Sequence, residues 1–351
     1  MSGVHLLGVG ATLPSRNARG ARPLAREAVS AALADAGVTA AEVDGVAIAS
    51  ADPGFDLGCY DVLGEARRPY KCRCGLGAIA LHSSWNAVSS GAAGVVLCVG
   101  HDFAGAEEED AAETLETQAA AAREYMQHSG ATEEHLARVA AKNRRHGAAN
   151  PHALPSTAAV DADEVLASEL LVWPLRRLMV APPAEGAAAV VLGSHDVVRR
   201  HGPKAPRVQA SVLLDGDSPD GAAAARAARL GYFSAGLGPE QIDVAEVEDP
   251  TPVEEIEAYE ALEFAPPGTG PELVESGFTA LGGVVPVNPS GGALAQGLVK
   301  GAGGILQLFE LSLQLRDRAG QRQVPGARTA LALSGSATAP GHVTSLTILT
   351  T

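Results

Sequence analysis

The sequence is poor in several features that mark common classes of protein. Of its 351 residues only four are cysteine, aromatic residues make up 4%, and the 26 Lys and Arg are outnumbered by 41 Asp and Glu, for a net charge of −15. The acidic excess argues against a nucleic-acid-binding protein, which needs clustered Lys and Arg. Four cysteines do not make a disulfide framework. No apolar run is long enough to span a membrane.

The N-terminus gives no sign of export. Residues 1–4, MSGV, do not form a charged region followed by an apolar stretch, which is the pattern of a signal peptide. We therefore expect a cytoplasmic protein with reduced thiols and with neither a membrane nor a nucleic acid as partner.

What the sequence does contain is the pattern of an α/β protein. Hydrophobic residues make up 46%, enough to bury a sizeable core, and 351 residues are enough for one large domain or two ordinary ones. Strands and helices alternate, which favours a parallel sheet with helices on its faces. In the first half we predict strands at residues 3–12, 43–49 and 94–100 and helices at residues 23–36 and 75–90. In the second half we predict strands at residues 207–214, 244–248, 329–333 and 344–349 and helices at residues 219–235, 253–262 and 293–315.

A short signature occurs once in each half. AGVTAAEVD (residues 36–44) and AGLGPEQID (residues 235–243) both follow the first helix of their half, with the aspartate seven residues after the glycine. Each glycine stands where a glycine commonly ends a helix. Two copies in matching contexts indicate a duplicated α/β unit.

Residues 104–185, between the halves, have a different character. EEEDAAETLETQAAAAREYM is acidic and helical in pattern, and TEEHLARVAAKNRRHG is predicted to be a capped helix that begins after Thr132. We expect this insertion to lie over one face of the core, where loops that shape a substrate site are commonly built.

The stretch KCRCGLGAIALH (residues 71–82) allows three interpretations of its two cysteines. As a nucleophile, Cys74 would precede a helix whose N-terminus lowers the pKa of the thiol, and its own backbone N–H would help to bind an oxyanion. As a metal pair, Cys72 and Cys74 would need two more ligands. Only Cys59 and Cys98 remain, without a spaced partner, so we expect no metal site. As core residues, both would be small buried thiols.

Several motifs, in this order along the chain, resemble those of the thiolase superfamily, in particular its sterol-carrier-protein type. Cys74, Gly77 and Ala80 match the family's Cys-x-x-Gly-x-x-Ala elbow. EGAAAVVL (residues 185–192) resembles the strand that follows the family's loop region, and VNPSGGALAQG (residues 287–297) resembles its Asn-Pro-Ser-Gly-Gly turn. The resemblance covers nearly the whole chain.

The resemblance implies an α/β thiolase fold, with two duplicated βαβαβ halves in a five-layered α-β-α-β-α arrangement and an inserted loop region. We expect an N-terminal half of residues 1–103 and 186–205, a loop region of residues 104–185 and a C-terminal half of residues 206–351. The family normally forms a homodimer or a dimer of dimers, with the strand that resembles residues 94–100 pairing with its twofold mate. Members of this branch also pair with a small zinc-ribbon/OB-fold protein.

The chain departs from the family's catalytic motifs. Leu298 stands where the resemblance implies the histidine that activates the nucleophile, and Glu248 stands where it implies the histidine of His-Asp-x-Phe. Residues 333–335, Leu-Ser-Gly, lack the C-terminal cysteine of ordinary thiolases. The remaining candidates are Cys74, the backbone N–H of Gly335 as an oxyanion donor, and Glu248. Glu248 is either an acid/base or, with Asp249, a cap of the following helix.

These residues favour two hypotheses. The first is a thiolase-like acyltransferase or carbon–carbon bond enzyme of lipid metabolism, acting on an acyl-CoA or carrier-protein thioester. Cys74 would be its acyl acceptor, Glu248 its acid/base and Gly335 its oxyanion donor, with the thioester as substrate and no bound cofactor. The second is a catalytically impaired thiolase-like subunit that binds a partner protein or acts as an aldolase-type component. Neither predicts ordinary thiolysis, because leucine cannot exchange a proton.

Overall fold

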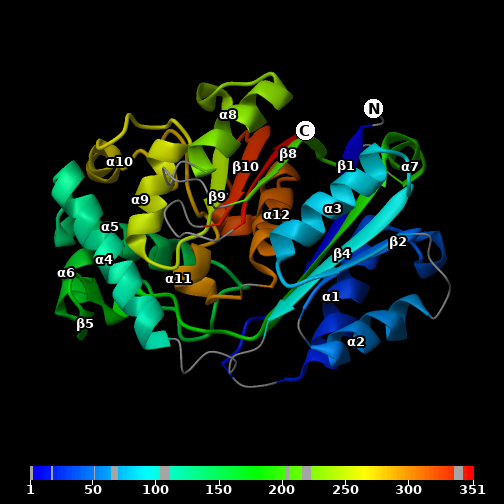
Figure 1. The fold of residues 1–351 in the computed structure, drawn as a ribbon, viewed down its shortest axis with the longest axis horizontal. Coiled ribbons are helices and arrows are strands. Elements are labelled where there is room, and N and C mark those ends of the chain that lie inside the picture. The colour runs from blue at the N-terminus through cyan, green and yellow to red at the C-terminus, as the bar shows by residue number, and fades with distance from the viewer. Residues whose placement is uncertain are drawn as a thin grey trace.

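We describe the fold from a computed structural model (Figure 1). The structure describes residues 3–16, 19–50, 52–64, 70–102, 111–201, 205–215, 223–299, 301–335 and 343–351. None of the helices within these residues is both long enough and apolar enough to cross a membrane.

The core of the fold is a nine-stranded sheet with the order β3-β2-β4-β7-β1-β8-β11-β10-β9. Two half-sheets join in its middle, where β1 and β8 pair over a short antiparallel stretch. Neighbouring strands β3, β2 and β4 are parallel, as are β9 and β10. The strands are β1 (Val4–Ala11), β2 (Gly45–Ala49), β3 (Tyr70–Cys74), β4 (Val95–Asp102), β7 (Gly186–Ser194), β8 (Arg207–Leu214), β9 (Val244–Val247), β10 (Thr329–Ser334) and β11 (Thr344–Thr350). A separate hairpin pairs β5 (Leu170–Val172) with β6 (Leu175–Arg176).

The two half-sheets have the same strand order, which confirms the expected duplication. Counted outward from the junction, β1-β7-β4-β2 in the first half corresponds to β8-β11-β10-β9 in the second. β3 continues the first half beyond β2, and Val287 makes a parallel bridge with Ala245 of β9 at the equivalent place. One α/β unit has therefore been used twice.

The helices complete a five-layered arrangement (Figure 1). α1 packs on the outer face of the first half-sheet with α2 beside it, α3 and α12 contact strands of both halves, and α8 covers the outer face of the second half with α9 beside it. These helices are α1 (Ala21–Ala36), α2 (Pro53–Leu63), α3 (Gly77–Ser89), α8 (Ala223–Ala235), α9 (Pro252–Ala261) and α12 (Gly303–Leu315). Shorter helices are α7 (His195–His201), α10 (Gly270–Ser276) and α11 (Gly292–Gln296).

The packing of α1 on β1 follows directly from the sequence. Apolar residues at helical spacing, such as Leu24, Ala28 and Ala32, are buried against the sheet, and α1 ends at Gly37 with a φ of 63°. A Cβ at Gly8 of β1 would lie 2.3 Å from the backbone nitrogen of Ala36. Glycine at this position therefore lets the helix lie directly on the strand.

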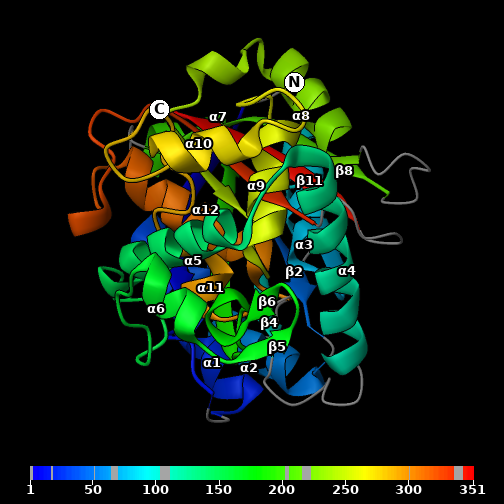
Figure 2. The ribbon, with the colours of Figure 1, turned by 90° about the vertical axis from the view of Figure 1, so that its left-hand side faces the viewer.

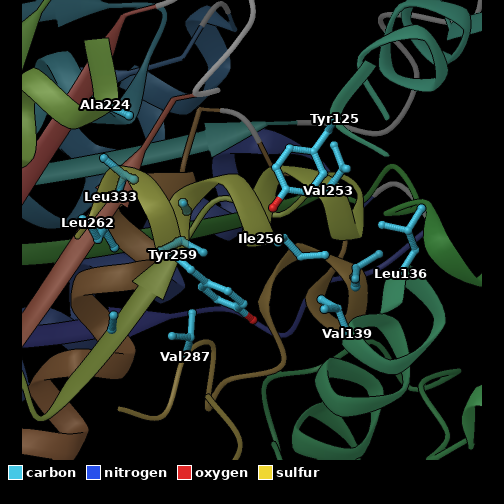
Figure 3. Close-up of a cluster of buried hydrophobic side chains, with 14 of the residues drawn as sticks. Tyr125, Leu136, Val139, Ala224, Val253, Ile256, Tyr259, Leu262, Val287 and Leu333 are labelled. Atoms are coloured by element: carbon cyan, nitrogen blue, oxygen red, sulfur yellow. The ribbon is translucent and has the colours of Figure 1, made fainter. Parts of the chain in front are cut away.

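The chain between β4 and β7 forms further elements beside the second half (Figure 2). They are α4 (Ala111–Ser129), α5 (Glu133–Ala148), α6 (Ala162–Ala167) and the β5–β6 hairpin. The prediction that a capped helix begins after Thr132 is confirmed, since Thr132 and His135 form the capping box of α5. Leu136 of α5 and Ile256 of α9 belong to one hydrophobic cluster, which ties this region to the second half (Figure 3).

Some local features differ from the predictions. The helix expected at residues 293–315 is two helices, α11 and α12, because the chain leaves the helical conformation at Gly297, whose φ is 85°. β3 was not expected, although its side chains alternate between half-buried and exposed as in a strand with one solvated face. The strand at residues 94–100 is not at an edge, because β4 lies between β2 and β7, and the edge of this half is β3.

Candidate active site

Cys74 is the last residue of β3, at the carboxyl ends of three parallel strands. In the sheet, Cys74 is paired with Ala49 of β2, and Ala49 is paired with Gly100 of β4 on its other side. The half-buried Sγ donates to the carbonyl of Leu76 at 3.3 Å. α3 begins three residues later, at Gly77. The fold therefore places the thiol where a parallel α/β sheet commonly holds its ligands.

The surroundings of this thiol raise its pKa, in the direction opposite to activation. Burial, together with the neighbouring Cys72 thiol, raises the pKa of Cys74 to about 11 and outweighs the backbone hydrogen bonds at the start of α3. At neutral pH the thiol is therefore protonated, whereas the nucleophile in acyl transfer is the thiolate.

Of the other cysteines, Cys59 and Cys98 are buried in the core and Cys72 is half-buried. Ala47 of β2 is paired with Cys72 of β3 on one side and with Cys98 of β4 on the other. Cys72 is two residues before Cys74 in β3, so all three thiols are on the same face of the sheet, and Cys98 is fully buried. Cys59 is buried on the other face, in the cluster around α1. Within the described residues, no three His, Cys, Asp or Glu side chains are grouped so that they could hold a metal ion.

Glu248 and Gly335 meet at the carboxyl edge of the second half-sheet. β9 and β10 are parallel neighbours, and these residues directly follow them. The backbone N–H of Gly335 donates to Oε2 of Glu248 at 2.6 Å, and the Glu248 N–H donates to the carbonyl of Leu333 at 3.0 Å. The backbone donor predicted for an oxyanion thus binds the carboxylate of Glu248 in this structure.

The interpretation of Glu248 and Asp249 as a cap of the following helix is wrong. The residue that precedes α9 is Thr251. Asp249 instead accepts from the backbone N–H groups of Ala293 at 2.6 Å and Leu294 at 3.5 Å, in the first turn of α11. Glu248, which is only partly buried, keeps one carboxylate oxygen outside the bond to Gly335.

The first turn of α12 packs between the start of α3, which follows Cys74, and the end of β10, which precedes Gly335. A Cβ at Gly304 would lie 2.9 Å from Oγ of Ser334 and 3.7 Å from the backbone nitrogen of Ala78. Ser334 immediately precedes Gly335, and Ala78 is in the first turn of α3. Ser334 is itself fixed, because its Oγ donates to Oε1 of Gln307 at 2.6 Å. The two half-sheets therefore contribute to one region of the molecule.

Leu298 packs as an apolar residue between backbone segments. Its N–H donates to the carbonyl of Pro182 at 2.8 Å, and its carbonyl accepts from Ala184 at 3.3 Å. Its partly buried side chain contacts the large cluster that includes α5 and α9. Nothing in this position can exchange a proton with a substrate.

His101 and His82 each make contacts of their own with residues other than Cys74. His101 is at the end of β4 and 2% exposed, and its ring stacks on Phe55 with 4.7 Å between the ring centroids. Because Gly100 faces α12, its neighbour His101 faces the opposite side of the sheet, away from Cys74. His82 of α3 lies 2.9 Å from Oγ of Ser211.

A buried polar network positions the turn before α11. Asn288, with a φ of 51°, accepts from the N–H of Val247 and donates to Oε2 of Glu255, each at 2.8 Å. Nζ of Lys142 lies 2.5 Å from Oε1 of Glu255. Asn143 donates to Glu255 at 2.5 Å and to Asp249 at 2.8 Å. The network therefore joins α5 and α9 to the end of β9, next to Glu248.

Similarities to known proteins agree with this geometry. Residues 210–350 match the family described as Thiolase C-terminal domain-like. The chain is 32% identical to sterol carrier protein 2 of Gallus gallus over 93% of this chain and 68% of that protein. It is 33% identical to an acetyl-CoA acetyltransferase of Methanothermobacter thermautotrophicus, over 87% of this chain and 88% of that protein.

The chain belongs to the thiolase superfamily. Its relatives place it with the sterol-carrier-protein-2 type. The solved structure of the Ltp2-ChsH2(DUF35) aldolase, 24% identical, matches 99% of this chain and 97% of that chain with a TM-score of 0.86, in agreement with the fold. This superfamily member spans 41% of the length of sterol carrier protein 2 of Bos taurus, to which it is 38% identical over 60% of its own length.

Sequence reasoning missed the buried network of this thiolase-superfamily member. Lys142 and Asn143 follow Leu136 and Val139 on the apolar side of α5, and such polar residues in an otherwise apolar stripe are a detectable signal. Glu254 was missed as well. Its carboxyl is fully buried beside Thr251, and burial raises its pKa to about 7. No local pattern marks Glu254, because its burial depends on elements distant in the sequence.

Proposed function

We propose that this chain is an enzyme that makes or breaks a carbon–carbon bond next to an acyl thioester, carried by CoA or a carrier protein, by aldol-type chemistry. The observation that carries the proposal is the contact between Glu248 and the Gly335 N–H, together with the burial that raises the pKa of the Cys74 thiol. The geometry offers a general base and a backbone donor but no activated nucleophile. Aldol chemistry needs the first two and does not need acyl transfer.

The proposed cleavage starts from a β-hydroxyacyl thioester. The Glu248 carboxylate takes the hydroxyl proton as the bond between Cα and Cβ breaks, which yields an aldehyde or ketone and the enolate of the shortened acyl thioester. Protonation of that enolate at Cα by Glu248 completes the cycle. When Glu248 becomes neutral, the hydrogen bond that it accepts from the Gly335 N–H weakens, because hydrogen bonds to charged groups are stronger than those to neutral groups. That N–H is then available to the enolate oxygen.

The test compares two reactions of the purified protein. With a panel of β-hydroxyacyl-CoA substrates, we expect release of an aldehyde or ketone and a shortened acyl-CoA, detected by mass spectrometry. With acetoacetyl-CoA and CoA, we expect thiolysis far below the roughly 10 s⁻¹ typical of enzymes and no acyl adduct on the intact protein. Thiolysis at an ordinary rate, with an adduct that Cys74→Ala abolishes and Cys72→Ala leaves, would instead establish Cys74 as the acyl acceptor.

A second candidate function is a subunit that acts only with a partner protein. The similar aldolase structure carries the names of two proteins, Ltp2 and the DUF35 protein ChsH2. A small zinc-ribbon/OB-fold partner would fit this interpretation. Turnover by the purified chain alone would exclude an obligatory partner.

We further propose a homodimer in which β3 pairs with β3 of a second copy. β3 is the edge of the first half-sheet, so its outer backbone groups lack a strand partner within the described chain. Both cations of β3 have partners in the same protomer: Lys71 lies over the ring of Tyr60 at 5.3 Å, and Arg73 pairs with Asp56 at 3.1 Å. These contacts limit the repulsion between cations of two paired β3 strands. Light scattering at micromolar concentration is expected to give the dimer mass. A stable monomer would refute this arrangement.

A further inference from the structure

A small pocket between α5 on one side and the end of α10 with the segment after it on the other is lined by cations. Its volume is about 200 Å³, and Arg138, Lys142 and Arg145 of α5 form one wall, with Val274 and Thr279 opposite. Spacings of four and three residues place the three cations on one face of the helix. Among the residues that the structure describes, no acidic side chain lines the pocket. In a chain with a net charge of −15, this is an unusual local environment.

The three cations differ in how far their charge is already neutralised. Lys142 is 8% exposed and paired with Glu255, so it forms a fixed floor. Arg138 pairs with Glu134 of the same helix at 2.9 Å, and both side chains are exposed to solvent. Exposed pairs of this kind are weak and exchange readily. Arg145 is exposed and takes part in no ion pair with any residue that the structure describes.

We propose that this pocket binds a phosphate group, either free phosphate or a phosphate monoester. The guanidinium groups of Arg138 and Arg145 provide planar pairs of donors that match phosphate oxygens. The ammonium of Lys142 already donates to Glu255, Tyr259 and the carbonyl of Val287, so it adds only its positive charge beneath the pocket. The volume is below the roughly 300–1,000 Å³ typical of pockets for drug-sized molecules, so the pocket suits an anionic group and not a whole nucleotide.

The pocket is distinct from the site of Cys74 and Glu248 but is connected to it. Lys142 forms the floor of the pocket and also belongs to the network of Glu255, Asn288 and Asp249. A phosphate above Lys142 adds negative charge next to the ion pair of Lys142 and Glu255. Phosphate binding should therefore change amide hydrogen exchange in the turn at residues 288–292.

The experiment titrates the full-length protein with inorganic phosphate in phosphate-free buffer by calorimetry, and separately with phenyl phosphate as a monoester. We expect one saturable site per chain with a dissociation constant on the order of 1 mM or tighter. Arg145→Glu should weaken binding about tenfold or more, the loss typical of a charge-assisted contact. Because Arg145 is exposed, this variant should fold, which circular dichroism checks.

Arg229→Glu is the matched control, since it makes the same charge change on an exposed side chain of α8. It should bind phosphate like the wild type. Binding of inorganic phosphate alone would identify the free anion as ligand, whereas tighter binding of phenyl phosphate would identify a monoester, and both support the site. No saturable binding up to about 10 mM, or equal weakening by both variants, would overturn the proposal. Binding is measured without turnover, so this result is independent of the proposed enzymatic function.

Discussion

Lys142→Met is expected to destabilise the fold by about 3–5 kcal/mol, the loss seen when one partner of a buried ion pair is removed. Methionine keeps the length of the side chain but leaves the fully buried carboxylate of Glu255 without its cation, and leaves the carbonyl of Val287, now 2.9 Å from Nζ, without a donor. Urea unfolding in phosphate-free buffer, followed by circular dichroism, measures the free energy of unfolding.

Arg138→Met is the control for this experiment. It lies one helical turn away on the same helix, and its exposed pair with Glu134 has the i,i+4 spacing that contributes only about 0.3–0.5 kcal/mol. Similar stabilities of the two variants, both within about 1 kcal/mol of the wild type, would show that Glu255 is held by its other hydrogen bonds and that Lys142 is dispensable for the fold.

Glu248→Gln is expected to lower kcat for β-hydroxyacyl thioester cleavage by about 10²–10⁴-fold, the usual contribution of a general acid or base. The amide oxygen of glutamine can still accept the hydrogen bond from Gly335, so the local structure should remain while the proton acceptor is lost. Steady-state rates and circular dichroism of the purified variant separate these two effects.

Glu272→Gln, an exposed position on α10, makes the same change of charge and should leave the rate at the wild-type value. If Glu248→Gln were as active as this control, Glu248 would be a structural partner of Gly335 and not the base. Glu254 would then be the next acid to test, since burial brings its pKa to about 7.

Much of the architecture could be predicted from local sequence. Local patterns located β1, α1 and β8 to within a few residues. β1 is a short run that is buried on both faces, and α1 buries one continuous apolar face. The paired glycine signature at Gly37 and Gly236 predicted the duplication, since a helix that ends in the left-handed conformation favours glycine wherever the unit is repeated. The elbow and turn motifs predicted the superfamily.

The tertiary structure alone decided the chemistry at those motifs. Cys74 follows the family pattern, yet its pKa depends on the burial produced by strands and helices from distant parts of the chain. The hydrogen bond between Gly335 and Glu248 joins residues 87 positions apart, and the contact of Lys142 with Glu255 joins residues 113 apart. Local sequence patterns report which face of an element is buried. They do not report which side chains from other elements lie opposite that face, and those neighbours set the charge, protonation and hydrogen bonds of the candidate site.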